Sequence, residues 1–419
     1  MSRHFLRAAA LAAALLPAAW AAAAPLSLER AVDLAVERSQ TARSARAGAT
    51  SAAEMARAAG QRPDPMLAFG VDNLPATGGN RFSTNAEDMT MKRIGLSQEW
   101  VSADKRAARE GVATAMHRRE AAMEPIAAAD ARLQTALAYV EAYFAAEAWK
   151  LATLDEQHAR EALEAGKGRL ATVSGNSAEV LALAGALGSA EDESAAMQQQ
   201  QATAATSLQR WIGVSTDELA EPRLAGAPNQ DEFVGGHPLV IARQRDIEVA
   251  RQDADATRLN RRPTWRYEVS YGQRVGRPDL VSFGVSIPLP VAPADRQDRE
   301  TAAKLAMVDK AEADLAESQR AAAAEYAALA GDARRLQERI DRYQGAVLTP
   351  LGQRTQATLA AYRSNQAGLA MVFEARHAEV DAQRKLLGLQ RDWAKARAQL
   401  VFKPVSQRAA QRAAQGAAP

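Results

Sequence analysis

Four short segments of alternating residue types interrupt a chain that otherwise has the pattern of alanine-rich helix. Residues 265–288 contain two such runs, in which large apolar residues alternate with polar or small ones, separated by the turn-forming residues 274–279. A period of two predicts a β-hairpin. Residues 66–72 and 93–100 repeat the pattern, so the sequence predicts four strands. Because an isolated hairpin is only marginally stable in water, these strands need partners.

The two faces of the predicted strands differ in chemistry. The apolar and aromatic face carries Leu67, Phe69, Val71, Ile94, Leu96, Trp265, Tyr267, Val269, Tyr271, Phe283, Val285 and Ile287. The opposite face carries Arg266, Glu268, Ser282 and Ser286. Such alternation is expected of lipid-facing and lumen-facing positions in a transmembrane barrel. It is equally expected of a four-stranded sheet on a soluble core, so the strands alone leave both interpretations open.

Residues 1–23 have the pattern of a secretory signal peptide. Arg3 and Arg7 precede a short apolar run, which ends in alanines that offer small-residue cleavage sites. We expect the mature chain to start near Ala23 or Ala24. The chain contains no cysteine, which excludes a disulfide, a thiolate metal site and an acylated cysteine. Any membrane attachment would therefore have to come from the fold.

The composition argues against several classes of function. The 52 Lys and Arg residues nearly balance the 50 Asp and Glu residues, so we expect no nucleic-acid partner. The sequence has no Gly-Xaa-Ser-Xaa-Gly motif, phosphate-binding loop or paired histidines. Met89 and Met91 could bind a soft metal but lack a third ligand. We therefore expect no enzyme, no cofactor and no metal site.

Two long helical stretches, residues 104–163 and 295–362, dominate the rest of the chain. Sixty helical residues would extend about 90 Å, far beyond the usual globular helix. Each stretch is followed by a short break and a second helical stretch, residues 177–211 and 369–401. A short break between long helices predicts an antiparallel helical hairpin.

The two halves of the sequence match in order and spacing. Arg62-Pro63 corresponds to Arg262-Pro263, and Gly95-Leu96-Ser97 corresponds to Gly284-Val285-Ser286. These landmarks predict an internal duplication, each copy being helix, two strands and helical hairpin. The expected divisions are a first repeat at 24–213, a linker at 214–236, a second repeat at 237–402 and a disordered tail at 403–419. Because lipid does not tolerate open sheet edges and barrels have at least eight strands, a membrane barrel would have to be shared between subunits.

Two local motifs add a resemblance to a known family. Residues 362–375 resemble the helical-hairpin tip of the TolC-like outer-membrane factor family, and the resemblance covers essentially the whole mature chain. Residues 64–67, 73–75 and 89–95 are similar to its heavy-metal efflux branch, the CzcC and CusC-like proteins. The resemblance implies an α+β membrane protein that forms a homotrimer, with four strands per protomer in a shared twelve-stranded barrel. It further implies a periplasmic tunnel of helices, a periplasmic adapter protein and an inner-membrane pump, expected to be of the RND type.

The same resemblance implies roles for particular residues. The hairpin tips, which would contact the adapter, are Ser174, Gly175, Asn176, Ser364, Asn365, Gln366 and Gly368. Acidic side chains just after the second tip ring the narrowest part of the tunnel in several members, and by position these fall on Met371 and Glu374. Only Glu374 matches, so a double acidic ring is not expected, and Asn365 stands where glycine is usual. Glu374 could instead be a solvated acid that favourably complements the helix dipole.

The expected function is a passive exit duct in the cell outer membrane, which exports heavy-metal cations as part of a tripartite efflux system. One alternative keeps the architecture but carries organic drugs or a protein of type I secretion. Another, from a different class, is a periplasmic coiled-coil adapter or scaffold without a pore.

Overall fold

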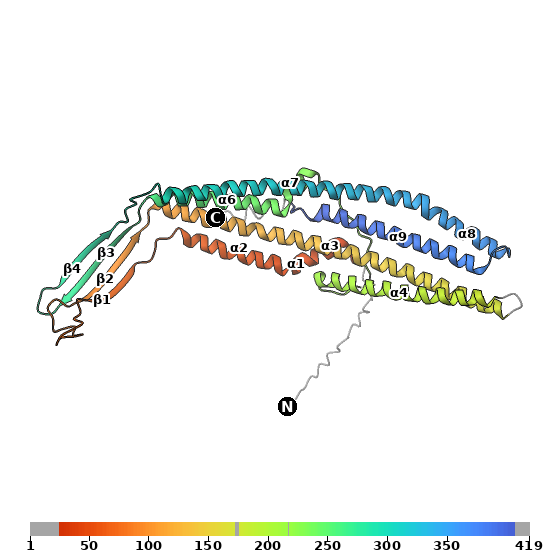
Figure 1. Cartoon of the computed structure of the whole chain (residues 1–419), viewed down its shortest axis with the longest axis horizontal. Coiled ribbons are helices and arrows are strands. Elements are labelled where there is room, and N and C mark those ends of the chain that lie inside the picture. The colour runs from red at the N-terminus through yellow and green to blue at the C-terminus, as the bar shows by residue number, and fades with distance from the viewer. Residues whose placement is uncertain (1–24, 172–175, 217, 407–419) are drawn as a thin grey trace, which may run out of the picture.

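A computed structural model describes residues 25–171, 176–216 and 218–406. The molecule is elongated, with a β-sheet at one end and helical hairpins that extend away from it (Figure 1). The strands are β1 Met66–Asp72, β2 Met91–Trp100, β3 Trp265–Arg274 and β4 Leu280–Ser286. The helices are α1 Leu28–Arg38, α2 Gln40–Ala59, α3 Ala103–Leu170, α4 Ser177–Ile212, α5 Gln230–Gly236, α6 Pro238–Arg258, α7 Gln297–Tyr343, α8 Thr349–Arg363 and α9 Leu369–Phe402. The predicted fold class, long helical hairpins with four strands, is confirmed.

The 68-residue helix α3 is the spine of the first half. Its buried positions include small residues that recur every seven residues. They are Ala115, Ala122, Ala129 and Ala136, then Ala145, Ala152, Ala159 and Gly166. Small residues at heptad spacing let neighbouring helices approach closely. Helices α2 and α4 lie end to end along α3, with α2 on the sheet side and α4 at the far end (Figure 1).

The second half repeats this arrangement. Helix α7 continues through a π-helical turn, Gln344–Leu348, into α8, and helices α6 and α9 lie end to end beside this long rod. Gly95-Leu96-Ser97 lies in β2 and Gly284-Val285-Ser286 lies in β4, which are the second strands of the two pairs. The order of elements in the two halves therefore corresponds as the duplication predicts.

Four antiparallel strands form one sheet in the order β1-β2-β3-β4, and the central β2–β3 pair joins the two halves. The register aligns Leu96 with Val269 and Trp100 with Trp265. It also aligns Phe69 with Ile94 and Phe283 with Val269, so the apolar row of each strand lies on one face. Within the described residues, the outer edges of β1 and β4 have no partner strand. The sheet is thus amphipathic and open at both edges.

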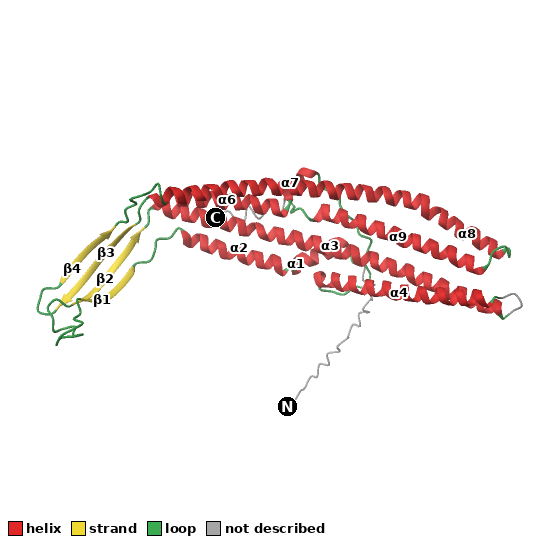
Figure 2. Ribbon diagram, in the orientation of Figure 1, coloured by secondary structure: helices red, strands yellow, loops and turns green. Residues whose placement is uncertain are grey.

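Among the described residues, no helix covers either face of this sheet (Figure 2). On the apolar face, Phe69 is 74% exposed and Phe283 is 80% exposed. Ile287, which the sequence assigns to this row, lies just beyond the end of β4 and is also exposed. The alternative of a sheet resting on a core of the same chain is therefore wrong.

Three local features differ from the sequence prediction. Residues 26–60, whose apolar spacing predicts a single helix, are instead broken at Ser39, which is extended and caps α2 by accepting a hydrogen bond from the Ala42 N–H. The expected linker contains the helix α5, which begins with an Asn229–Glu232 capping box. The tail was expected to be disordered from residue 403, but the Val405 N–H donates to the Gly236 carbonyl at 2.7 Å and its side chain is buried. Residues 407–419 and the expected signal peptide lie outside the described residues.

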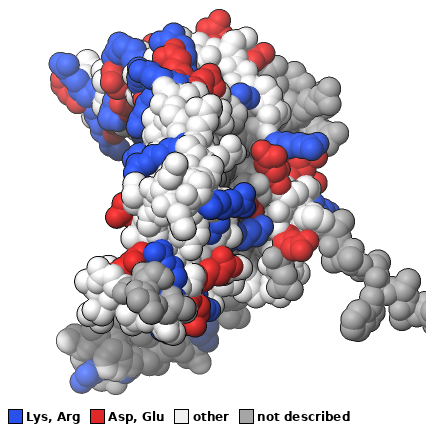
Figure 3. Space-filling view, turned by 90° about the vertical axis from the view of Figure 1, so that its right-hand side faces the viewer, with Lys and Arg blue, Asp and Glu red and all other residues white. Residues whose placement is uncertain are grey.

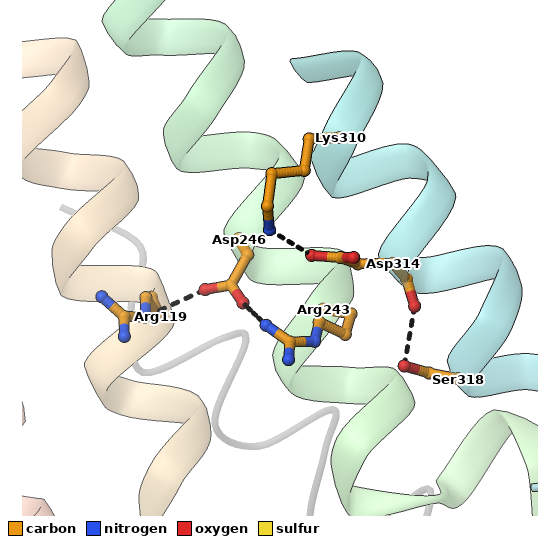
Figure 4. A network of polar contacts seen from close by, with 6 residues as sticks. All are labelled: Arg119, Arg243, Asp246, Lys310, Asp314 and Ser318. Atoms are coloured by element: carbon orange, nitrogen blue, oxygen red, sulfur yellow. Dashed lines mark hydrogen bonds and ion pairs between the residues drawn. The ribbon is translucent and has the colours of Figure 1, made fainter. Parts of the chain in front are cut away.

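Ion pairs join the two halves along the shaft. Asp246 of α6 accepts from Arg119 of α3 at 3.1 Å and from Arg243 of its own helix at 3.1 Å (Figure 4). On α7, the Lys310 ammonium pairs with the Asp314 carboxylate at 2.8 Å, which lowers the Asp314 pKa. Such exposed pairs contribute little stability individually. Arg119–Asp246 links α3 to α6, and the pairs Arg251–Glu312 and Lys304–Asp253 link α6 to α7.

The buried N-cap residue His237 makes stability depend on pH. Its Nδ1 accepts from the Leu239 N–H at 3.3 Å, so the cap requires an unprotonated nitrogen. Burial lowers the pKa of His237, and nearby Lys403 also lowers it, against the opposing effect of Glu325. Because the folded-state pKa is below the unfolded-state value, the unfolded chain binds the extra proton, and this contribution to stability is lost as pH falls below about 6.5.

We expect the substitution His237→Asn to reduce this pH dependence, since asparagine also caps a helix and does not titrate. Thermal unfolding would be followed at about pH 7.5 and about pH 5.5, on either side of the ordinary histidine pKa. Between the higher and the lower pH, the unfolding temperature should fall further for the wild type than for the variant. An equal loss in both proteins would contradict the assignment.

Candidate functional site

The polar face of the sheet carries a set of charges that crosses three strands. Arg93 on β2 donates from Nε to Asp72 of β1 at 2.9 Å, and from Nη1 to Glu268 of β3 at 3.2 Å. The register places Arg266 opposite Ser286, and Ser270 opposite Ser282, on the same face. The four predicted polar-face residues, Arg266, Glu268, Ser282 and Ser286, therefore lie on the same face of the sheet.

Arg93 and Asp72 were missed by the sequence reasoning. Arg93 precedes Ile94 and so falls on the opposite face, which is the signal that could have found it. Glu99 and Arg274 also lie on the polar face by register. The face thus presents both signs of charge, with acids and arginines interleaved across neighbouring strands.

The two ends of the sheet are also distinct. At the helical end, Trp100 pairs in register with Trp265, and the Arg62 guanidinium lies 5.0 Å from the Trp100 ring centre. At the far end, Arg277 of the β3–β4 turn donates to Asp88 of the β1–β2 loop, from Nε at 2.9 Å and from Nη2 at 2.6 Å. The two hairpin loops, distant in sequence, are therefore tied together.

The opposite end of the molecule consists of the two helical-hairpin tips. After α8, Asn365 adopts a left-handed conformation with φ of 57°, which asparagine tolerates better than other non-glycine residues. Gly368 is the N-cap residue of α9. The predicted tip residues Ser364, Asn365, Gln366 and Gly368 all lie in this turn. At the other tip, Asn176 caps α4, while Ser174 and Gly175 lie outside the described residues.

The structure brings the two tips together. Leu369 at the start of α9 packs with Leu163 of α3 and Leu183 of α4 in one buried cluster. Seen from this end, acidic and basic side chains are interspersed over the surface (Figure 3). The helix ends at the two tips therefore pack into one unit, and its outer surface carries both acidic and basic side chains.

Met371 and Glu374 lie on the exposed side of the first two turns of α9. Val372 and Ala375, their neighbours, are buried against the other helices. Among the described residues, no basic side chain pairs with Glu374. Its carboxylate is therefore available to whatever medium or subunit faces this side of α9.

An ion-pair seam joins α9 to the first hairpin. His377, Arg384 and Arg391 are spaced by seven residues, and each contacts an acid on α3 or α4. His377 Nδ1 lies 2.7 Å from Asp155, Arg384 pairs with Glu193, and Arg391 lies 3.7 Å from Glu141. Asp155 is buried, and its second oxygen has no hydrogen-bond partner within the described chain. This seam holds the two hairpins side by side.

Between residues 25 and 406, outside the gaps at 172–175 and 217, no helix is long and apolar enough to cross a membrane. Over the same residues, no three His, Cys, Asp or Glu side chains are grouped so that they could hold a metal ion.

Comparisons with known proteins show similarity in fold. No protein-family model and no curated protein sequence matches the chain. The outer membrane protein VceC from Vibrio cholerae superposes with a TM-score of 0.71 at 19% identity, covering 90% of this chain and 96% of VceC. The Campylobacter jejuni outer membrane channel CmeC gives 0.75 at 12% identity, covering 93% and 89%. CusC gives 0.74 at 15% identity, covering 91% and 93%.

The chain has the fold of these outer-membrane channels. The match extends over sheet and helices alike, since about nine-tenths of each chain is covered. The match does not distinguish the heavy-metal branch of the predicted family, because VceC and CmeC match almost as well as CusC. The sheet, the hairpin tips and the ion-pair seam are therefore all parts of a fold that this chain shares with outer-membrane channels.

The seam should contribute to stability through Arg384, whose side chain is only 17% exposed and contacts both Glu193 and Asp381. We expect Arg384→Gln to lower the free energy of unfolding by about 1–2 kcal/mol, because two carboxylates lose a charged partner. Hydrogen exchange should quicken in α4 and α9.

Arg335→Gln is the matched control, since Arg335 makes an exposed pair with Asp332 within one helix. It should change stability by less than about 0.5 kcal/mol. Equal effects of the two substitutions would show that the seam does not hold the hairpins together.

Proposed function

We propose that the chain is one subunit of a trimeric outer-membrane channel that serves as the passive exit duct of a tripartite efflux system. The observation that carries this proposal is the uncovered apolar face of a sheet whose two edges are both open. In water such a face favours association, and in lipid the open edges must be paired. A ring of identical sheets embedded in a membrane satisfies both requirements.

The dimensions of the sheet suit this arrangement. The ten residues of β3 extend about 33 Å at 3.3 Å per residue, which at a tilt of about 40° matches the apolar band of about 25 Å. Three copies would supply twelve strands, above the minimum of eight. The apolar row that includes Tyr267 and Phe283 would then face lipid, and the row of Arg93, Arg266 and Glu268 would face the lumen.

The remaining parts have roles in the same proposal. The helices would form a tunnel in the periplasm, and the paired tips would meet a periplasmic adapter protein docked on an inner-membrane pump of the RND type. The chain would perform no catalysis, since transport is driven by the pump. A soluble periplasmic monomer would instead support the adapter or scaffold alternative.

For the cargo, we propose heavy-metal cations, supported by the similarity of residues 64–67, 73–75 and 89–95 to the metal-efflux branch. Organic drugs or a secreted protein remain the alternative cargo for the same architecture. A strain lacking the gene would be exposed to panels of metal salts and organic compounds. Increased toxicity of the organic compounds alone would overturn the metal assignment.

The shared barrel can be tested with introduced cysteines, because the natural chain has none. Gly70→Cys on β1 and Ser282→Cys on β4 lie on the polar face at opposite edges of the sheet. In outer-membrane fractions, a short bifunctional thiol reagent should convert the double variant into covalent dimers and trimers on denaturing gels.

The matched control combines Gly70→Cys with Ser270→Cys, because Ser270 lies on the interior strand β3 and has no neighbouring subunit. This pair should stay monomeric on the gel. Cross-linking in neither variant, together with a monomer in solution, would contradict the barrel.

Glu374 is proposed to line the tunnel constriction, because it is exposed within two turns of the second tip. A ring of three carboxylates would favour cations. We expect Glu374→Ala to reduce the cation preference of single channels in planar bilayers. Glu164→Ala, near the other tip and paired with Lys167 at 2.8 Å, should leave it unchanged. Unaltered selectivity with reduced thermal stability in Glu374→Ala would instead favour the helix-dipole role.

A further inference from the structure

The apolar row of β4 continues beyond the end of the sheet. The last paired residue is Ser286, yet Ile287, Leu289 and Val291 extend the alternation of Val281, Phe283 and Val285. Leu289 is 78% exposed and Val291 is 95% exposed. Two large aliphatic side chains so fully exposed in one short segment need an apolar environment.

Prolines prevent this segment from becoming more sheet. Pro288 and Pro290 lack the N–H that a neighbouring strand would require. The five residues from Ile287 to Val291 can therefore extend up to about 16 Å toward the helices without joining the barrel. The segment lies where the sheet meets the helical shaft (Figure 1). It follows Ser286, whose register partner Arg266 is next to Trp265, and Trp265 is paired with Trp100. Tryptophans of this kind are enriched at the membrane–water interface.

A basic pocket lies under the same segment. It has a volume of about 430 Å³ and is lined by Leu289, Val291 and the cations Lys105, Arg261, Arg262 and Arg296, with no acidic residue in its lining. The three arginines are already paired, with Asp298, Asp104 and Glu300 respectively. Lys105 is the exception.

Lys105 is 9% exposed, and its ammonium donates to the Thr264 hydroxyl at 3.1 Å. No carboxylate of the described residues lies within ion-pair distance of it. Burial lowers its pKa, as does the neighbouring Arg109, while Glu99 acts in the opposite direction. A buried ammonium with unused donors is costly unless an anion compensates it.

We propose that this pocket binds a phospholipid of the periplasmic leaflet, with its phosphate at Lys105 and its acyl region against Leu289 and Val291. The proposal rests on the proposed membrane function. Phosphate matches the Lys105 ammonium, which no described carboxylate pairs, and acyl chains match the aliphatic row that prolines exclude from strand pairing. Since the chain has no cysteine to acylate, such a site would tie the junction of barrel and tunnel to the membrane.

The test uses the full-length protein in nanodiscs that contain phosphatidylglycerol and phosphatidylethanolamine. Native mass spectrometry would count the phospholipids that stay bound after transfer to detergent. Lys105→Gln should weaken retention about fivefold, the ratio that corresponds to about 1 kcal/mol for one basic side chain at an anionic surface. Leu289→Ser with Val291→Ser should weaken it at least as much, and because both residues are exposed this variant should fold normally.

Lys310→Gln on the shaft is the matched control and should retain lipid like the wild type. Added inorganic phosphate should fail to displace the lipid, whereas displacement would mean that the site takes free phosphate. Equal retention in wild type and both variants, in trimers that still conduct ions, would overturn this inference alone. Cross-links from Leu289→Cys to a neighbouring subunit would identify a second copy as the occupant and would also overturn it. A wild type that neither inserts nor forms trimers would instead overturn the proposed function.

Discussion

An uncovered apolar sheet face with two open edges is the constraint on which the rest of the structure depends. Backbone groups at the outer edges of β1 and β4 need partners, and in lipid only other strands can supply them. One chain provides four strands, too few to close a barrel. The apolar row from Leu67 to Val285 and the charged row around Arg93 assign opposite environments to the two faces. In the proposed channel, oligomerisation, membrane insertion and a polar lumen would therefore all depend on this one feature.

The helices connect this sheet to the tips over a distance that no compact domain would span. Only two residues separate β2 from α3, and α3 ends next to the first tip, so a single rod links both ends of the molecule. Small residues at heptad positions let α2 and α4 pack closely on it. The charged seam on α9 adds specificity, because His377, Arg384 and Arg391 meet acids at matching spacing only in one alignment. Close helix packing and the matched spacing of these charged pairs together hold the two helical hairpins side by side along the same axis.

Much of this could be predicted because the signals are local. Alternation over ten residues identified the strands and their faces, and the breaks at Pro63, Pro263 and Gly368 marked element ends. The break at Ser39 and the helix α5 were missed although each has a cap signature, Ser39 before α2 and Asn229 with Glu232 before α5. The heptads of buried alanine were also readable, but alanine is so common in this chain that the pattern is hidden by the background. The π-helical turn between α7 and α8 has no such signal.

By itself, the sequence determined the type of each long element, the duplication and which side chains share a strand face, because these follow from periodicity along one chain. Only the tertiary structure showed that no helix of the described chain covers the sheet. The sequence could not show this, since a soluble core and a membrane impose the same alternation on a strand. It also decided which distant groups meet: Arg93 with Asp72 and Glu268, Asp155 with His377, and Lys105 with the segment that follows β4. Those contacts depend on the three-dimensional registry of strands and helices, which no local pattern encodes.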